Sequence, residues 1–91
     1  MFNSRSRIPT RTDFQKAIDE DFQEATSAGR TYLDLTSREL HQKVGGYPSN
    51  NHRMPICCSV MRAYMKNDDV VLDEPPKGAG ATLKIRYKIP R

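Results

Sequence analysis

The chain has 91 residues, which is the length of one small domain. Hydrophobic residues make up 36% and charged residues 29%, a balance typical of folded proteins, so a wholly disordered chain is excluded. No apolar run approaches the roughly 18 residues that a membrane span needs. The first residues also lack the apolar segment of a secretory signal. We therefore expect a cytoplasmic protein without a membrane partner.

The net charge of +4 is unevenly distributed along the chain. Residues 1–11 hold three arginines and no acid, and we expect a flexible basic tail there, before a single domain at residues 12–91. Residues 12–30 hold five acids and two bases, whereas residues 49–67 hold three bases and no acid. Such asymmetry suits an anionic partner, most simply nucleic acid, although a solvated basic surface has the same composition.

The residues that most often bind metals are few and poorly spaced. They are His41, His52, Cys57 and Cys58. Their spacing matches no zinc pattern, and adjacent cysteines rarely bond to each other. We expect no metal, no cofactor and no disulfide, with one or both cysteines in the core. Residues 77–80 lack the spacing of a phosphate-binding loop, and the paired carboxylates have no base or metal partner, so we expect no enzyme activity.

A first helix is predicted over Thr12–Ala28. Thr12 and Gln15 have the spacing of a capping box, and Gly29 suits the left-handed position after the last turn. Five apolar residues recur at helical spacing on one face: Phe14, Ala17, Ile18, Phe22 and Ala25. The opposite face is acidic, so this helix is interpreted as scaffold and as the candidate interface of a homodimer.

A second, shorter helix is predicted over Ser37–Val44, after an extended segment at residues 30–35. Thr36 and Glu39 form a capping box, while residues 35 and 40 are leucines at the positions of a hydrophobic staple. Gly45 ends the helix and opens a Gly-Gly-Tyr-Pro turn. The segment before the helix is a candidate first strand.

A third helix is predicted from about Asn50 or Asn51 to Lys66, with one asparagine as its cap and Pro55 near its first turn. The inward stripe is predicted to consist of Ile56, Val60, Ala63 and Tyr64. A second stripe is polar and basic and consists of Pro55, Ser59, Arg62 and Lys66.

A β-hairpin is predicted over residues 70–89, with its tip at residues 77–81. Its second strand alternates strictly between apolar and polar residues. The apolar set is Leu83, Ile85, Tyr87 and Ile89, and the polar set is Thr82, Lys84, Arg86 and Lys88. The strand should therefore bury one face and expose three cations on the other.

The predicted order is helix, short strand, helix, turn, helix, strand, loop, strand, which gives an α+β fold. By this order, residues 31–91 resemble the winged helix-turn-helix superfamily. The stretches LHQKVGGYPSNNHRMPICCSVM and PPKGAGATLKIRYKIPR are also similar to those of small bacterial or phage proteins. The resemblance implies three helices with a short strand and a C-terminal β-hairpin wing. It also implies binding of double-stranded DNA through the helix at about residues 51–66, assisted by the wing at Lys77.

Candidate DNA contacts fall on the third helix and the wing. On the helix they are Asn50, Asn51, His52, Arg53, Ser59, Arg62 and Lys66, and on the wing Lys77, Lys84 and Arg86. Asparagine and arginine at the start of such a helix can pair with base edges, while wing cations suit phosphates. The alternative for the helix is a cap with solvated bases, and for the wing cations it is protection of an exposed strand.

Two functions remain open from the sequence. The first is a DNA-binding protein, either a transcriptional regulator or a DNA-targeting module. The second is a winged-helix module for protein–protein interaction, an adaptor or inhibitor acting through the acidic first helix or the wing edge.

Overall fold

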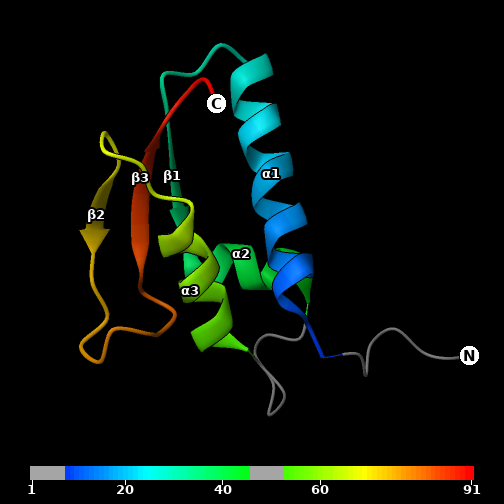
Figure 1. Ribbon diagram of the computed structural model, residues 1–91, viewed down its shortest axis with the longest axis vertical. Helices are drawn as coiled ribbons and strands as arrows, with labels where there is room; N and C mark the ends of the chain where they lie inside the picture. Colours follow the sequence, from blue (N-terminus) through cyan, green and yellow to red (C-terminus); the bar gives the residue numbers. More distant parts are fainter. Residues whose placement is uncertain (1–7, 46–52) are drawn as a thin grey trace, which may run out of the picture.

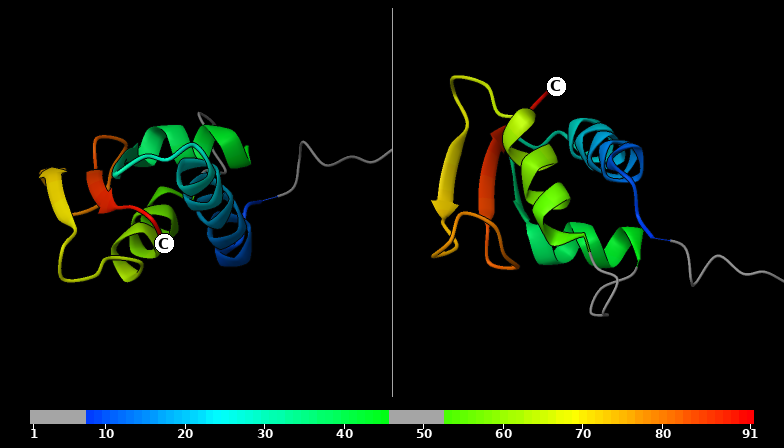
Figure 2. Two further views of the ribbon diagram at one scale, coloured as in Figure 1. Left: turned by 90° about the horizontal axis from the view of Figure 1, so that it is seen from above. Right: turned by 60° about the horizontal axis from the view of Figure 1, so that its bottom comes forward.

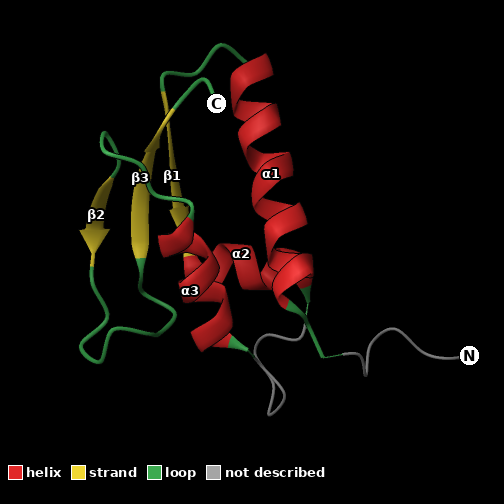
Figure 3. Cartoon of the chain, viewed as in Figure 1, coloured by secondary structure: helices red, strands yellow, loops and turns green. Residues whose placement is uncertain are grey.

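The computed structural model describes residues 8–45 and 53–91, which form three helices and a three-stranded antiparallel sheet (Figure 1). The elements in chain order are α1 (Arg11–Ser27), β1 (Tyr32–Thr36), α2 (Ser37–Val44), α3 (Met54–Ala63), β2 (Val70–Asp73) and β3 (Lys84–Lys88). Figure 3 shows the helices, the strands and the long loop between β2 and β3. The α+β class and the predicted order of elements are confirmed.

The N-terminus of α1 lies earlier than the sequence pattern predicted. Thr10, and not Thr12, is the N-cap: its hydroxyl accepts a hydrogen bond from the Asp13 backbone N–H, and the Asp13 carboxylate accepts one from the Thr10 N–H. A carboxylate at this end also interacts favourably with the helix dipole, an advantage that the neutral amide of Gln15 lacks. Arg11, predicted to end the flexible tail, is therefore the first residue of α1.

The C-terminus of α1 is closed as predicted. Gly29 has a φ of 74° and follows the C-cap Ala28. The Gly29 N–H donates to the Thr26 carbonyl at 3.1 Å and the Arg30 N–H to the Ala25 carbonyl at 3.0 Å, which is the Schellman pattern. The predicted apolar face is also confirmed, because all five of its members are buried.

The segment before α2 is strand β1, and α2 itself has the predicted bounds. Its N-cap is Thr36, which exchanges hydrogen bonds with Glu39 in a capping box. Leu35 and Leu40 are both buried in the core, as a staple requires, and Gly45 is the C-cap with a φ of 110°.

The bounds and the buried face of α3 differ from the prediction. The helix begins at Met54, has Arg53 as an N-cap without a side-chain hydrogen bond, and ends at Ala63. Pro55 lies in the first turn as predicted, and because proline has no N–H to donate, it favours a helix start immediately before it. The buried residues are Met54, Cys57, Cys58, Val60 and Met61. Of the predicted inward stripe only Val60 is buried, and Ala63 is exposed.

Strand β3 is the middle strand of the sheet, in the order β1-β3-β2. It pairs antiparallel with β1, where Leu35 lies opposite Ile85, and with β2, where Val71 lies opposite the same isoleucine. The predicted hairpin of β2 and β3 is thus confirmed. The four apolar residues of its second strand are 0–2% exposed.

Helices α1 and α3 lie on one side of the sheet, and α2 continues directly from the end of β1 (Figure 2). The core lies between the helices and the sheet and is built by the inward residues of β1 and β3 against α1 and α3. Tyr87 is at its centre: its ring meets that of Phe22 edge-on at 5.0 Å, and its hydroxyl donates to the Met61 carbonyl at 2.7 Å. Among the described helices, none is long and apolar enough to cross a membrane.

Candidate nucleic-acid interface

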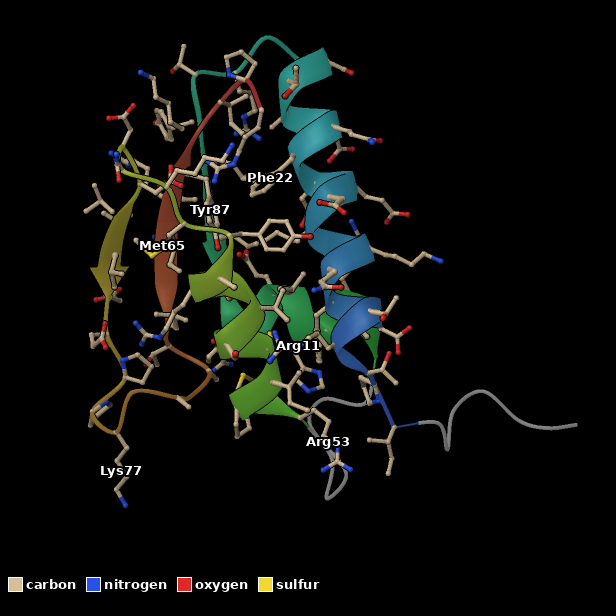
Figure 4. All side chains as sticks on the ribbon, in the orientation of Figure 1. Arg11, Phe22, Arg53, Met65, Lys77 and Tyr87 are labelled. Atoms are coloured by element: carbon tan, nitrogen blue, oxygen red, sulfur yellow. The ribbon has the colours of Figure 1, made fainter. Side chains whose placement is uncertain are left out.

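The predicted site residues fall into two groups, those outside the described residues and those with a defined place. Asn50, Asn51 and His52 lie outside the described residues, as does the predicted turn at residues 46–48. Arg53 is described: it directly precedes α3 and is exposed. Its guanidinium lies at the lower end of the molecule in Figure 4. Within residues 8–45 and 53–91, the Arg53 side chain has no acidic partner.

His41 joins the end of α2 to the start of α3. Its side chain is fully buried, and its ring meets that of Phe14 edge-on at 5.0 Å. Nε2 accepts the Arg53 backbone N–H at 2.8 Å, and Nδ1 lies 3.1 Å from the Gly45 carbonyl oxygen. Since a carbonyl can only accept, Nδ1 carries the proton, and the ring is the neutral Nδ1–H tautomer. His41 therefore sets the approach of the two helices, a role that its sequence context did not indicate.

The exposed side of α3 is shared with the first residue of α1. Ser59, a predicted contact, is exposed on α3 and accepts a hydrogen bond from Arg11 Nη2 at 3.0 Å. Arg11 thus adds a cation beside α3 that was not among the predicted site residues. Recognising Thr10 as the helix cap would have placed Arg11 in the folded domain.

The second cation predicted on α3 is engaged within the molecule. Arg62 is half-buried, and its Nη2 donates to Glu74 Oε2 at 2.9 Å and to the Gly78 carbonyl at 2.8 Å. Lys66, predicted to end the polar stripe, lies beyond the last residue of α3. Its backbone N–H donates to Asp69 Oδ2 at 2.7 Å, and its side chain is exposed.

The loop between β2 and β3, residues 74–83, is called the wing loop below. Gly80 is its anchor: the Gly80 carbonyl accepts the Ser37 hydroxyl at 2.5 Å and the Cys58 thiol at 3.3 Å. Lys77 is at the exposed tip, before Gly78, whose φ is 82°. Figure 4 shows Lys77 pointing away from the body at the same end of the molecule as Arg53. Lys77 forms no ion pair with any described residue.

The two cations predicted on the outer face of β3 differ in their surroundings. Arg86 forms two hydrogen bonds with the Asp34 carboxylate, at 2.8 and 3.0 Å, and its guanidinium lies 4.3 Å from the centre of the Tyr32 ring. The hydrogen bond from Arg86 lowers the pKa of Asp34. Lys84 is half-buried next to this pair and has no ion-pair partner among the described residues.

The acidic face of α1 is partly neutralised by α2. Lys43 Nζ lies 2.7 Å from Asp21 and 3.6 Å from Glu20, and the hydrogen bond to Asp21 raises the pKa of Lys43. A cavity of about 670 Å³ lies between α1 and the end of α3, with Phe22 and Tyr64 on its walls.

The cysteines are both free and buried, as predicted for core residues. Burial raises the pKa of the Cys57 thiol to about 12, with a further contribution from Cys58. The Cys57 thiol faces the Ser37 carbonyl at 3.5 Å, and both ring nitrogens of His41 are engaged elsewhere. No group of three or more metal-binding side chains occurs in the part of the chain that the structure describes.

No protein-family model matches the chain, and the searches found no significantly similar curated protein or solved structure.

Proposed function

We propose that the chain is a winged helix-turn-helix protein that binds double-stranded DNA. The three helices with a hairpin, and the sheet order β1-β3-β2, are compatible with this fold. The observation that carries the proposal is the common placement of Arg53 and Lys77. Both lie at one end of the molecule, one at the start of α3 and the other at the tip of the wing loop, and no described acid pairs with either.

In the proposed complex, the start of α3 enters the major groove and the wing loop lies on the phosphate backbone. Arg53 is suited to the O6 and N7 atoms of guanine, a contact that contributes about 1–3 kcal/mol of discrimination between bases. Asn50, Asn51 and His52 precede it in the chain and belong to the same proposed contact. Lys77 adds affinity without reading sequence, because it meets only phosphate.

The remaining cations have graded roles in this proposal. Arg11 and Ser59 extend the contact along the exposed side of α3. Lys66 and Lys84 reach phosphate only at the margin of the interface, since they lie beyond the helix and on the sheet face. Arg86 is occupied by Asp34 and contributes mainly to the sheet.

The test is fluorescence anisotropy with labelled duplex DNA of mixed sequence over a salt series. Each released phosphate counterion contributes about −0.9 to the slope of log K against log salt. Arg53→Ala and Lys77→Ala should each weaken binding and reduce the slope by about 1. Arg30→Ala is the matched control, because Arg30 is an exposed cation after the far end of α1. Absence of binding at low salt, or equal behaviour of all three variants, overturns the proposal.

A second candidate function is protein–protein interaction through the outer face of the sheet. That face and its edge strand β2 expose large apolar side chains: Tyr32 is 48%, Val70 52% and Leu72 40% exposed. An exposed edge strand can pair with a strand of another chain. Stoichiometric binding of one protein that Val70→Lys abolishes, in a chain without affinity for duplex DNA, would favour this function.

A homodimer is compatible with both candidate functions. In the case of DNA binding, a palindromic site is bound by two copies. Sedimentation with and without duplex DNA distinguishes the cases. A dimer that forms without DNA and dissociates on Val70→Lys would assign the outer face of the sheet to self-association. A dimer that forms only on a palindromic duplex would assign the symmetry to the DNA site.

A further inference from the structure

Arg62, near the C-terminal end of α3, hydrogen-bonds to both ends of residues 74–78 of the wing loop, which are called the wing turn below. One of its nitrogens, Nη2, donates to the Glu74 carboxylate at 2.9 Å and to the Gly78 carbonyl at 2.8 Å. Glu74 precedes the turn, and Gly78 closes it, with its N–H donating to the Pro75 carbonyl at 3.0 Å. Lys77 stands between these two attachment points. A single side chain of α3 therefore holds the backbone on either side of the exposed lysine.

The other side of the wing loop is held independently. Ser37 and Cys58 bind the Gly80 carbonyl, and the Ser37 N–H donates to the Leu83 carbonyl at 2.8 Å. These contacts fix the loop where it returns to β3, and Pro75 in the first half of the loop is buried. Among the described residues of α3, Arg62 alone hydrogen-bonds to residues 74–78, the part of the loop that carries Lys77.

The charge of Arg62 is compensated by the same contact. Glu74 is 56% exposed in its side chain and would repel a phosphate if it were unpaired. An arginine that already balances a carboxylate contributes little to counterion release. The donors of its Nη2 are used within the wing loop.

We propose that Arg62 is a positioning residue, which orders the wing turn so that Lys77 meets the DNA backbone, and not itself a DNA contact. This inference rests on the proposed binding of duplex DNA. It changes the assignment of Arg62 from the set of predicted contacts to the support of one of them. The same role explains why Glu74, although it is an acid close to the proposed interface, should favour binding: Glu74 is one of the two groups that Arg62 binds.

The first arm of the test is a double-mutant cycle in the DNA-binding assay. Lys77→Ala should weaken binding in the wild-type background, but by less than about twofold, the additivity limit, in an Arg62→Gln background. Glu74→Ala provides the sharper comparison, because it removes a negative charge and is exposed enough to leave the core intact. Simple electrostatics predicts tighter binding by this variant. The inference predicts weaker binding and, again, loss of the Lys77 effect.

A direct contact would give different results. Arg62→Gln would then lower the salt slope by about 1 beyond the effect of Lys77→Ala, and the two changes would be additive. Glu74→Ala would free Arg62 and strengthen binding. Either result overturns the inference while leaving the proposed function standing.

The second arm uses no DNA and measures the backbone order of the free protein by ¹⁵N relaxation. In Arg62→Gln and Glu74→Ala, the heteronuclear NOE should fall at Lys77 and Gly78 and remain unchanged at Ile85, in the middle of β3. An unchanged NOE at Lys77 overturns the ordering role. A wild-type chain that binds no duplex overturns the proposed function and with it the role in DNA binding, whatever the relaxation data give.

Discussion

Asp69 Oδ2 and Arg91 Nη1 lie 2.9 Å apart, in side chains that are 0% and 9% exposed. The carboxylate also accepts the Lys66 and Lys88 backbone N–H groups, each at 2.7 Å. Arg91 in turn donates to the Tyr64 carbonyl and stacks on the ring of Phe22, 4.9 Å from its centre. This pair therefore joins the end of α3, the end of β3 and the side of α1.

Replacement of Asp69 by alanine should destabilise the fold strongly. The change leaves a buried guanidinium and two backbone N–H groups without their acceptor, which costs about 3–5 kcal/mol of unfolding free energy. The neighbouring Asp68 is a matched control, because its side chain is 70% exposed and lies 3.5 Å from Lys88 Nζ. Asp68→Ala should change stability by less than about 0.5 kcal/mol. Urea unfolding followed by circular dichroism checks both, and equal midpoints would contradict the prediction.

The same carboxylate should make stability depend on pH in the acid range. Burial alone would raise the pKa of Asp69, but hydrogen bonds from Lys88, Lys66 and Arg91 outweigh it, so the folded-state pKa lies below the usual value. Its contribution is then complete above the unfolded pKa of about 3.9 and is lost as the pH falls through the folded pKa. The stability difference between the wild-type chain and Asp69→Asn should therefore be constant near neutral pH and shrink below about pH 4. A difference that grows on acidification has the wrong sign.

Two threonines near the start of α1 should respond differently to replacement by alanine. Thr10→Ala removes the N-cap hydroxyl and should cost about 1 kcal/mol of unfolding free energy. Thr12 is exposed within the first turn, so Thr12→Ala should cost less than about 0.5 kcal/mol. Thermal unfolding of the two single variants measures the contrast. The reverse order would show that α1 begins where the sequence pattern placed it.

Loss of the His41 ring should loosen the junction between α2 and α3. His41→Ala leaves the Arg53 N–H and the Gly45 carbonyl without their partner and should destabilise the fold by at least about 2 kcal/mol. His41→Gln keeps one donor and one acceptor and should recover part of that loss. The exchange rate of the Arg53 amide hydrogen reports on the junction directly. It should rise in His41→Ala more than the rate at Ile85, and a parallel rise at both would indicate general destabilisation only.

The cysteines should be unreactive in the folded protein. With a pKa of about 12, the Cys57 thiol is almost entirely protonated at pH 8, and it is fully buried. Iodoacetamide labelling read by mass spectrometry should be slow at Cys57 in buffer and fast in urea. Rapid labelling of Cys57 in the native chain would show that the start of α2 and helix α3 separate easily.

Local signals account for the parts of the fold that were predicted correctly. Helix α2 carries its own capping box at Thr36 and Glu39, and β3 alternates without interruption, so each pattern has only one interpretation. Helix α3 was harder, since Met54–Ala63 is apolar on several sides and its periodicity does not define a single buried face. The true register became evident only from packing against the other helices.

The candidate site was less accessible to sequence reasoning, because its charges are paired over long distances in the chain. Arg86 and Asp34 are 52 residues apart, and Arg62 and Glu74 are 12 apart. Neither pairing can be inferred from the composition of the sequence around the two residues. The sequence thus indicated which residues were basic, but not which of these charges are used inside the molecule and which remain available to a partner.

Because β3 is the middle strand, it determines when the sheet can form during synthesis. Strands β1 and β2 hydrogen-bond only to β3 within the sheet, so neither has a partner until residues 84–88 have left the ribosome. Helices α1 and α2 pack on each other and depend less on this segment. During synthesis, helices α1 and α2 can therefore pack together first, with their apolar faces uncovered. The strand pairings, which join distant segments of the chain, form last. A nascent chain arrested before Lys84 should accordingly be a target for chaperones and proteases, whereas the completed chain should not.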